Sequence, residues 1–183
     1  MDKESVYFRN GKLIAKSGDI RVYTMDNELF LEDGRMNLVA SDTKKSDYIW
    51  QIGNKPIGNC LVVGLGLGIV VNYLLSLNKV NNLTIIEENK DIINVVNKLN
   101  KLEGLFEIIC TDYFTYLYKS NTKYDFIFID CYTKIDETTL PYIADIVIAS
   151  KLNLKADGIL LGWFDNRTSE KLVDPFYSLF NTV

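Results

Sequence analysis

The pattern of apolar and polar positions divides the chain into two parts. Up to about residue 40, short apolar segments are separated by turn signals such as Asn10-Gly11, Ser17-Gly18 and Asp33-Gly34. Turns that recur roughly every eight residues are typical of a β-meander. Strands are therefore expected at residues 6–8, 12–16, 20–23, 28–31 and 36–40.

A short helix and a linker are expected to close this first part. Ser41 or Asp42 can cap a helix that runs through Ile52, because either side chain accepts a hydrogen bond from a free backbone N–H group. Gly53 and Pro56 then interrupt the pattern. These signals predict a domain of residues 1–55, made of the meander and the helix, followed by a domain of residues 56–183.

The second part alternates apolar strands with amphipathic helices. Strands are expected at 61–63, 83–86, 106–110, 126–129 and 158–164, and helices at 69–77, 91–102, 113–118, 138–154 and 169–180, the last of them broken at Pro175. Fully apolar strands that alternate with helices indicate a parallel sheet covered on both faces. The predicted fold class is α/β: a Rossmann-like, mainly parallel, doubly wound sheet of about five strands behind a small N-terminal β-meander.

Composition excludes several kinds of site. The net charge of −4 disfavours nucleic acid as a partner, because phosphate contacts need clustered Lys and Arg. The chain contains no His, so a Ser-His-Asp triad and a zinc site built on imidazole are excluded, and no metal site is expected. Three widely spaced cysteines and no signal-peptide pattern predict a cytoplasmic protein without disulfides.

The uncharged run from Cys60 to Leu77 approaches the length of a membrane span. Three glycines at alternate positions and Asn72 favour a strand, a turn and a helix there, so we expect no membrane partner.

Glycines and acids follow the ends of successive predicted strands. Gly64, Gly66 and Gly68 lie between a strand and a helix, where they allow a tight turn with or without a ligand. Glu87 ends the next strand, about twenty residues later, where an acid can accept both ribose hydroxyls of a bound adenosine. Glu88 is an alternative for that role, and either acid is also compatible with a solvated strand end.

Two further acids follow the third and fourth strands of this sheet. Asp112 is placed to accept a hydrogen bond from an adenine amino group, or to cap the helix that follows it. Asp130 lies beside the point where strand order reverses, which is where ligands bind in such sheets, or it is a turn acid. Four successive strands thus end in a glycine turn or an acid, which favours a ligand site over coincidence.

Four segments resemble, in order and spacing, the core motifs of class I S-adenosylmethionine-dependent methyltransferases: CLVVGLGLGIVVNYLL, LTIIEENKDIINVV, EIICTDYFTYL and YDFIFIDCYT. They look closest to spermidine synthase-like proteins, and ELFLEDGRMNLVASDTKKSDYIW is similar to the segment before the glycine loop in that branch. The resemblance implies S-adenosylmethionine or its decarboxylated form as cofactor. It implies that Glu87 holds the ribose, that Asp112 holds the adenine, and that Gly64, Gly66 and Gly68 hold the aminoacyl or aminopropyl end.

The chain departs from this family where the polyamine would bind. Leu67 stands in the glycine loop at the place of an acid, and the loop Asp130 to Lys134 lacks the family's second acid and its proline. The expected Tyr and acid of the preceding helix fall near Ser46 and Tyr48. A polyamine is a di-cation, and binding it requires paired carboxylates. The motifs of the cofactor site are therefore preserved in this sequence, whereas those of the polyamine site are not.

The resulting hypothesis is an enzyme that transfers a group from a sulfonium cofactor to a small-molecule acceptor. In-line displacement needs alignment and, for some acceptors, a base. Asp130 is the candidate catalytic residue, with Tyr132 and Asp165 as weaker candidates. Methyl transfer is slightly favoured over aminopropyl transfer. Cleavage of the cofactor and a non-catalytic cofactor-binding or interaction subunit remain as alternatives, and the GxGxG spacing disfavours a nicotinamide-dependent oxidoreductase.

Association is also expected. The predicted strand 158–164 is almost wholly apolar and would end the sheet, and a bare apolar edge invites pairing with another chain. We therefore expect a homodimer or a higher homo-oligomer.

Overall fold

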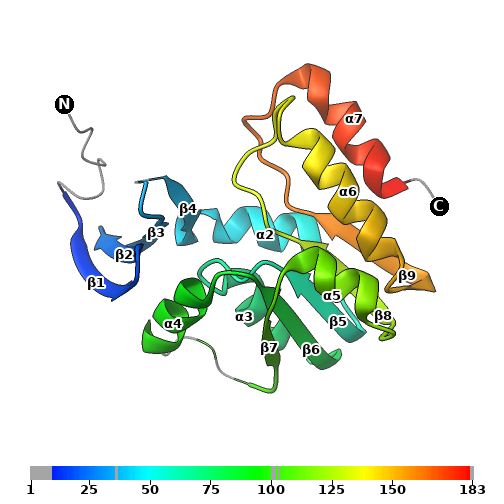
Figure 1. Cartoon of the computed structure of the whole chain (residues 1–183), viewed down its shortest axis with the longest axis horizontal. Coiled ribbons are helices and arrows are strands. Elements are labelled where there is room, and N and C mark those ends of the chain that lie inside the picture. The colour runs from blue at the N-terminus through cyan, green and yellow to red at the C-terminus, as the bar shows by residue number, and fades with distance from the viewer. Residues whose placement is uncertain (1–9, 36, 100–101, 103, 182–183) are drawn as a thin grey trace.

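The computed structural model describes residues 10–35, 37–99, 102 and 104–181 (Figure 1). The strand expected at 6–8 and the Met36 end of the strand expected at 36–40 lie outside these residues. The architecture consists of a small antiparallel sheet beside a larger parallel sheet that carries the helices.

The N-terminal sheet confirms the predicted meander. Its four antiparallel strands pair in sequence order: β1 (Lys12–Ser17), β2 (Ile20–Met25), β3 (Glu28–Glu32) and β4 (Leu38–Ser41). Val22 and Leu31 are fully buried partners in the β2–β3 register. Ser41 caps the following 3₁₀ helix η1 (Asp42–Lys44), which leads directly into α2 (Lys45–Ile52).

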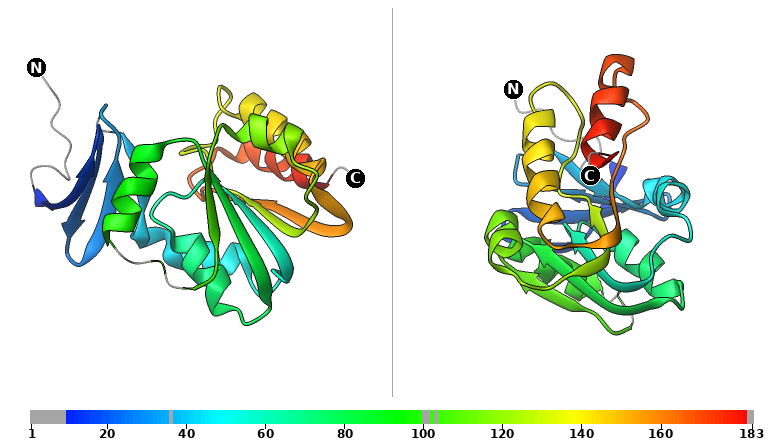
Figure 2. Two further views of the ribbon diagram at one scale, coloured as in Figure 1. Left: turned by 60° about the horizontal axis from the view of Figure 1, so that its bottom comes forward. Right: turned by 90° about the vertical axis from the view of Figure 1, so that its right-hand side faces the viewer.

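The second sheet has five parallel strands in the order β7-β6-β5-β8-β9, which confirms the predicted Rossmann-like fold. Helix α3 covers one face, and α5 and α6 cover the other (Figure 2). The elements are β5 (Gly58–Val63), α3 (Ile69–Ser76), β6 (Val80–Glu87), α4 (Lys90–Leu99), β7 (Glu107–Cys110), α5 (Tyr113–Lys119), β8 (Tyr124–Ile129), α6 (Leu140–Lys151), β9 (Leu154–Gly162) and α7 (Glu170–Asn181).

Helix α4 joins the two sheets. It packs against β1 and β2 on one side and against β6 on the other, and Figure 2 shows it between the sheets. The hydroxyl of Ser17 donates to Asp91 Oδ1 at 2.6 Å, and Lys98 Nζ donates to the carbonyl of Lys16 at 2.6 Å. The N-terminal sheet is thereby held over the carboxyl ends of the parallel strands.

Two predictions for the C-terminal part were wrong: the end of one helix and a break in another. Helix α6 ends at Lys151, and Leu154 already opens β9, where it pairs with Tyr124 across a register shift. Helix α7 continues through Pro175. A proline near the first turns removes one backbone hydrogen bond, and the burial of Leu172 and Phe176 holds the helix on both sides of it.

The run from Cys60 to Leu77 separates into β5, the glycine loop and α3, as predicted. No helix within the described residues has the length and apolarity that a membrane crossing requires. Strand β9 lies at one edge of the parallel sheet, with α7 packed against it and against α6. The expected homo-oligomer stays a prediction.

Candidate functional site

The glycine loop and the end of β8 meet at the point where strand order reverses. β5 and β8 are neighbours, and the chain leaves β5 toward β6 but leaves β8 toward β9. Gly64 has a φ of 100°, and a Cβ at this position would lie 2.4 Å from the carbonyl oxygen of Asp130. The two loops therefore touch because residue 64 has no side chain.

Two adjoining cavities lie at this point. The glycine-loop cavity, about 240 Å³, is lined by Gly64, Gly66, Glu87 and Asp130 among others. The aromatic cavity, about 320 Å³, includes Phe30 and Trp163 in its wall. Both cavities are lined by a shared set of residues: Val39, Ala40, Tyr48, Asp130, Tyr132 and Thr133. The arrangement is a two-part cleft between the N-terminal sheet and the carboxyl ends of the parallel strands.

Acids dominate the glycine-loop cavity. Its charged lining residues are Asp33, Glu87, Glu88 and Asp130, and within the described part of the chain no Lys or Arg lines it. Burial raises the pKa of Glu88, and the charge of Asp112 raises it further. Such a cavity favours a cationic ligand, because negative charges brought close together in a partly desolvated site repel an anion.

Glu87 is buried and binds the loops around it. Its Oε2 accepts a hydrogen bond from the Leu65 N–H at 2.9 Å, and its Oε1 accepts one from the Asn89 N–H at 2.8 Å. The hydroxyl of Tyr113 lies 3.4 Å from Oε1. Burial raises the pKa of Glu87, while these hydrogen bonds oppose the rise. Glu87 therefore fixes the glycine loop to the end of β6 in addition to lining the cavity.

Two of the sequence-predicted residues lie outside the cavity wall. Gly68 is the N-cap of α3, and a Cβ there would lie 2.5 Å from a methyl group of Leu102. Asp112 is exposed and caps α5, since its Oδ1 accepts a hydrogen bond from the Thr115 N–H at 2.7 Å. The roles predicted for them in cofactor binding stay predictions, and the cap is the alternative that the sequence left open for Asp112.

Asp130 lies where the two cavities join. Tyr48, which is buried in α2, donates from its hydroxyl to Asp130 Oδ1 at 3.2 Å. Burial raises the pKa of Asp130 to about 8; the hydrogen bond from Tyr48 opposes the rise, and the charge of Glu87 adds to it. A carboxyl with a pKa near neutrality can exchange a proton with a ligand at pH 7, as a general base or acid must.

The weaker catalytic candidates have structural partners. Tyr132 is buried and its hydroxyl donates to the carbonyl of Trp163 at 2.6 Å. Asp165 is buried and accepts three hydrogen bonds from the Arg167 guanidinium. Both side chains therefore shape the aromatic cavity by holding its wall.

Sequence reasoning missed the residues that the N-terminal sheet and the last loop contribute. Phe30, Ser41, Thr43, Lys44, Trp163 and Arg167 line the aromatic cavity. They come from distant parts of the chain, so no local spacing marks them. A signal existed for Trp163 and Arg167, because both follow the carboxyl end of the fifth parallel strand, on the edge of the sheet where ligands bind.

Solved structures with the same architecture include spermidine synthases. The spermidine synthase of Thermotoga maritima superposes with a TM-score of 0.67 at 15% identity, over 92% of this chain and 61% of that one. A spermidine synthase in complex with the transition state analogue AdoDATO gives 0.67 at 16% identity, over 92% and 60%. The N-methyltransferase NodS of Bradyrhizobium japonicum WM9 gives 0.54 at 13% identity, over 74% and 80%.

The chain shares the fold of spermidine synthase. It spans about 61% of the length of the Thermotoga maritima enzyme. No family model matches the chain, and no curated protein matches its sequence. At these identities the likeness establishes the fold, as the resemblance of the sequence motifs implied.

The two neighbouring acids at the end of β6 are expected to respond differently to loss of charge. Glu87→Gln leaves one of two backbone N–H groups without an acceptor, so we expect the unfolding free energy to fall by about 1–3 kcal/mol. Glu88→Gln removes the same charge from an exposed side chain and should leave the melting temperature nearly unchanged. Thermal denaturation of both variants, followed by circular dichroism, measures the difference. Equal losses would contradict the anchoring role of Glu87.

Proposed function

We propose that this protein is a group transferase that uses an adenosyl sulfonium cofactor, S-adenosylmethionine or its decarboxylated form. The observation that carries the proposal is the two-part cleft at the strand reversal. Its glycine-loop cavity has only acids as charged lining residues within the described part of the chain, and it shares Asp130 with the aromatic cavity. One part suits the donor and the other an acceptor, and Asp130 stands between them. The shared fold of spermidine synthase and an N-methyltransferase supports this reading.

The residues of the glycine-loop cavity fit a sulfonium cofactor better than a dinucleotide. A sulfonium and an ammonium group are cations, and the carboxylates of Asp33, Glu87 and Glu88 supply negative charge. A pyrophosphate is a dianion that would lie against the same carboxylates without a Lys or Arg from the described residues. Gly66, which lines this cavity with a φ of 51°, exposes backbone to the ligand.

When bound, the cofactor supplies a carbon activated by the positively charged sulfur. The protein's own residues then hold the two reactants in line and exclude water, which is the main requirement of such a displacement. Asp130 is the candidate base for an acceptor that must lose a proton, and Tyr48 holds its carboxyl in place through the hydrogen bond to Oδ1.

Methyl transfer is slightly favoured, because Leu67 replaces the acid that would hold the aminopropyl amine and the loop after Asp130 lacks the family's second acid. Aminopropyl transfer is the second candidate, since decarboxylated S-adenosylmethionine lacks a carboxylate and the acids of the glycine-loop cavity suit its extra positive charge. Incubation with each donor and a panel of acceptors, with products identified by mass spectrometry, distinguishes the two. Nucleoside products formed without an acceptor would indicate cleavage of the cofactor. The absence of any product would indicate a non-catalytic subunit.

Ligand-induced stabilisation tests the cofactor directly. S-Adenosylmethionine at about a hundred times its dissociation constant should stabilise the protein by about 2.7 kcal/mol, or about 5–11 °C in melting temperature. NAD should give no shift, because of its pyrophosphate. Differential scanning fluorimetry with both ligands, and with decarboxylated S-adenosylmethionine and methylthioadenosine, measures this. A shift with NAD and none with the adenosyl sulfur compounds would refute the assignment.

A further inference from the structure

The charges that line the aromatic cavity are the reverse of those that a polyamine site needs. Besides Asp130 at its junction, the charged lining residues among those that the structure describes are Lys44 and Arg167. Asp47 and Asp165, which form ion pairs with these cations, do not line the cavity. Lys44 Nζ lies 3.6 Å from Asp47 Oδ2, beyond ordinary hydrogen-bond length, so this ion pair is loose.

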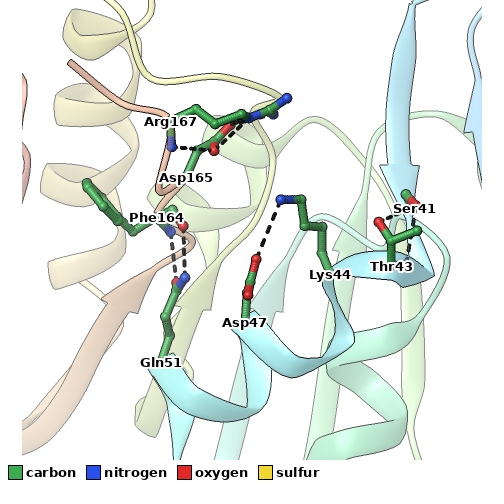
Figure 3. Close-up of polar contacts among 8 residues, drawn as sticks. All are labelled: Ser41, Thr43, Lys44, Asp47, Gln51, Phe164, Asp165 and Arg167. Carbon is green, nitrogen blue, oxygen red and sulfur yellow. Dashed lines mark hydrogen bonds and ion pairs between the residues drawn. The ribbon is translucent and has the colours of Figure 1, made fainter.

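Polar contacts surround the two cations (Figure 3). Arg167 forms a two-pronged ion pair with the buried Asp165, with Nη2 at 2.6 Å from Oδ2, and this fixes the guanidinium at the cavity. These hydrogen bonds hold the pKa of Asp165 below its usual value, and the nearby charge of Lys44 contributes. The positive charges of Lys44 and Arg167 are therefore both felt at Asp165.

A side-chain bridge sets the distance between the elements that carry the cations. Gln51 in α2 donates from Nε2 to the carbonyl of Phe164 and accepts from the Phe164 N–H at Oε1, both at 2.8 Å. Lys44 immediately precedes α2, and Arg167 follows Phe164 by three residues (Figure 3). The bridge thus holds the backbone segments that carry the two cations in place before any ligand binds, which reduces the entropy lost on binding.

The remaining wall is apolar, aromatic or hydroxylated. Phe30, Tyr48, Tyr132 and Trp163 supply rings, and the Tyr48 and Trp163 rings lie 6.4 Å apart. Ser41 and Thr43 add hydroxyl groups near Lys44. A volume of about 320 Å³ lies at the lower end of the range for small-molecule pockets.

We propose that the aromatic cavity binds a small acceptor with an apolar body and a carboxylate, and that Lys44 and Arg167 hold this carboxylate while the body lies against the aromatic wall. The inference rests on the proposed function, whose acceptor it assigns to the class of small organic acids. The carboxylate end lies at the cations, so the opposite end of the acceptor faces Asp130 and the donor. A di-cationic polyamine would place positive charge against Lys44 and Arg167.

Matched probes that differ in charge test the class of acceptor. In a Trp50→Phe variant, which removes the exposed tryptophan, Trp163 is the remaining fluorescent indole and reports on the cavity. Phenylacetate is expected to change its emission with saturation, whereas phenethylamine and putrescine are expected to leave it unchanged. Titrations up to about 10 mM cover dissociation constants into the millimolar range. Tighter binding of an amine, or no effect of phenylacetate, would overturn the proposal.

Charge-removing variants test the residues. Lys44→Gln and Arg167→Gln should each weaken phenylacetate binding about tenfold to a hundredfold, because each removes a charge-assisted contact. Lys119→Gln, at an exposed position on α5, removes the same charge elsewhere and should not change it. Arg167→Gln leaves the buried Asp165 without its ion-pair partner. If that variant does not fold, Lys44→Gln alone tests whether the cations bind the carboxylate. Lys44→Gln binding as well as Lys119→Gln would contradict the assignment.

Running the titrations with and without S-adenosylmethionine separates the two proposals. Phenylacetate binding without any thermal shift from S-adenosylmethionine would refute the proposed cofactor and leave the carboxylate subsite standing. A clear thermal shift together with preference for the amines would refute the carboxylate subsite and leave the cofactor.

Discussion

Replacing Asp130 by asparagine is expected to lower turnover by a factor of about 10²–10⁴. Asparagine keeps the shape of the side chain and an oxygen for the hydrogen bond from Tyr48, but it cannot accept a proton from the acceptor. Affinity for the donor should change much less, since the glycine loop, Glu87 and Glu88 are unaltered. Initial rates with the acceptor found by mass spectrometry, and calorimetry for the donor, measure the two effects separately.

A control variant makes this result specific. Asp145→Asn removes the same charge from an exposed position on α6 and should leave the rate unchanged. An Asp130→Asn rate within a few-fold of the unmodified protein would show that the acceptor needs no base there, and Asp130 would then be a binding residue.

The same substitution should also change how stability depends on pH. The pKa of Asp130 rises from 3.8 to about 8 on folding, because burial disfavours the charged form. The folded state therefore binds a proton that the unfolded state releases, and the resulting stability is present at low pH and is lost as the pH rises from about 4 to 8. Asp130→Asn has no such loss, so its melting temperature should exceed that of the unmodified protein increasingly between pH 5 and pH 8.5, by at least about 2–4 °C at the upper end. A constant difference would contradict the raised pKa.

Local patterns predicted those features of the fold that depend on neighbouring residues. The turn signals around Gly18 and Gly34 predicted the meander, and the apolar strands predicted a parallel sheet. The end of α6 was missed because Leu152 and Leu154 continue its apolar pattern, although Leu154 pairs with Tyr124 in the sheet. Local periodicity does not distinguish a helix end from a following strand when both are apolar.

The residues of the candidate site also fall into those that local sequence predicts and those that depend on distant contacts. Gly64, Glu87 and Asp130 were found because parallel strands place their carboxyl ends on one edge, so position in the chain predicts position in space. Nothing in the sequence brings Lys44 to Arg167, because the two lie together through the Gln51–Phe164 bridge between distant elements. The carboxylate of Glu87 likewise has a second role, since its bond to the Leu65 N–H follows from how the loop turns.

Gly64→Ala is expected to destabilise the protein strongly and to abolish donor binding. A φ of 100° is strained for any residue with a Cβ, and the new methyl group would lie 2.4 Å from the backbone oxygen of Asp130. Strain and overlap together should lower the unfolding free energy by about 3 kcal/mol or more, or the melting temperature by at least about 6–12 °C. Separating the ends of β5 and β8 should also remove the thermal shift caused by S-adenosylmethionine.

Gly53→Ala is the matched control, because it tests strain without overlap. Gly53 also has a positive φ, of 56°, but a Cβ there would meet nothing within 4 Å. Its substitution should cost only the backbone strain, about 1–2 kcal/mol, and should leave the thermal shift from S-adenosylmethionine intact. Comparing both variants by scanning calorimetry isolates the contact between residue 64 and Asp130. Similar losses in the two variants would mean that strain alone requires glycine in the loop and that the close approach of β5 and β8 contributes little to the site.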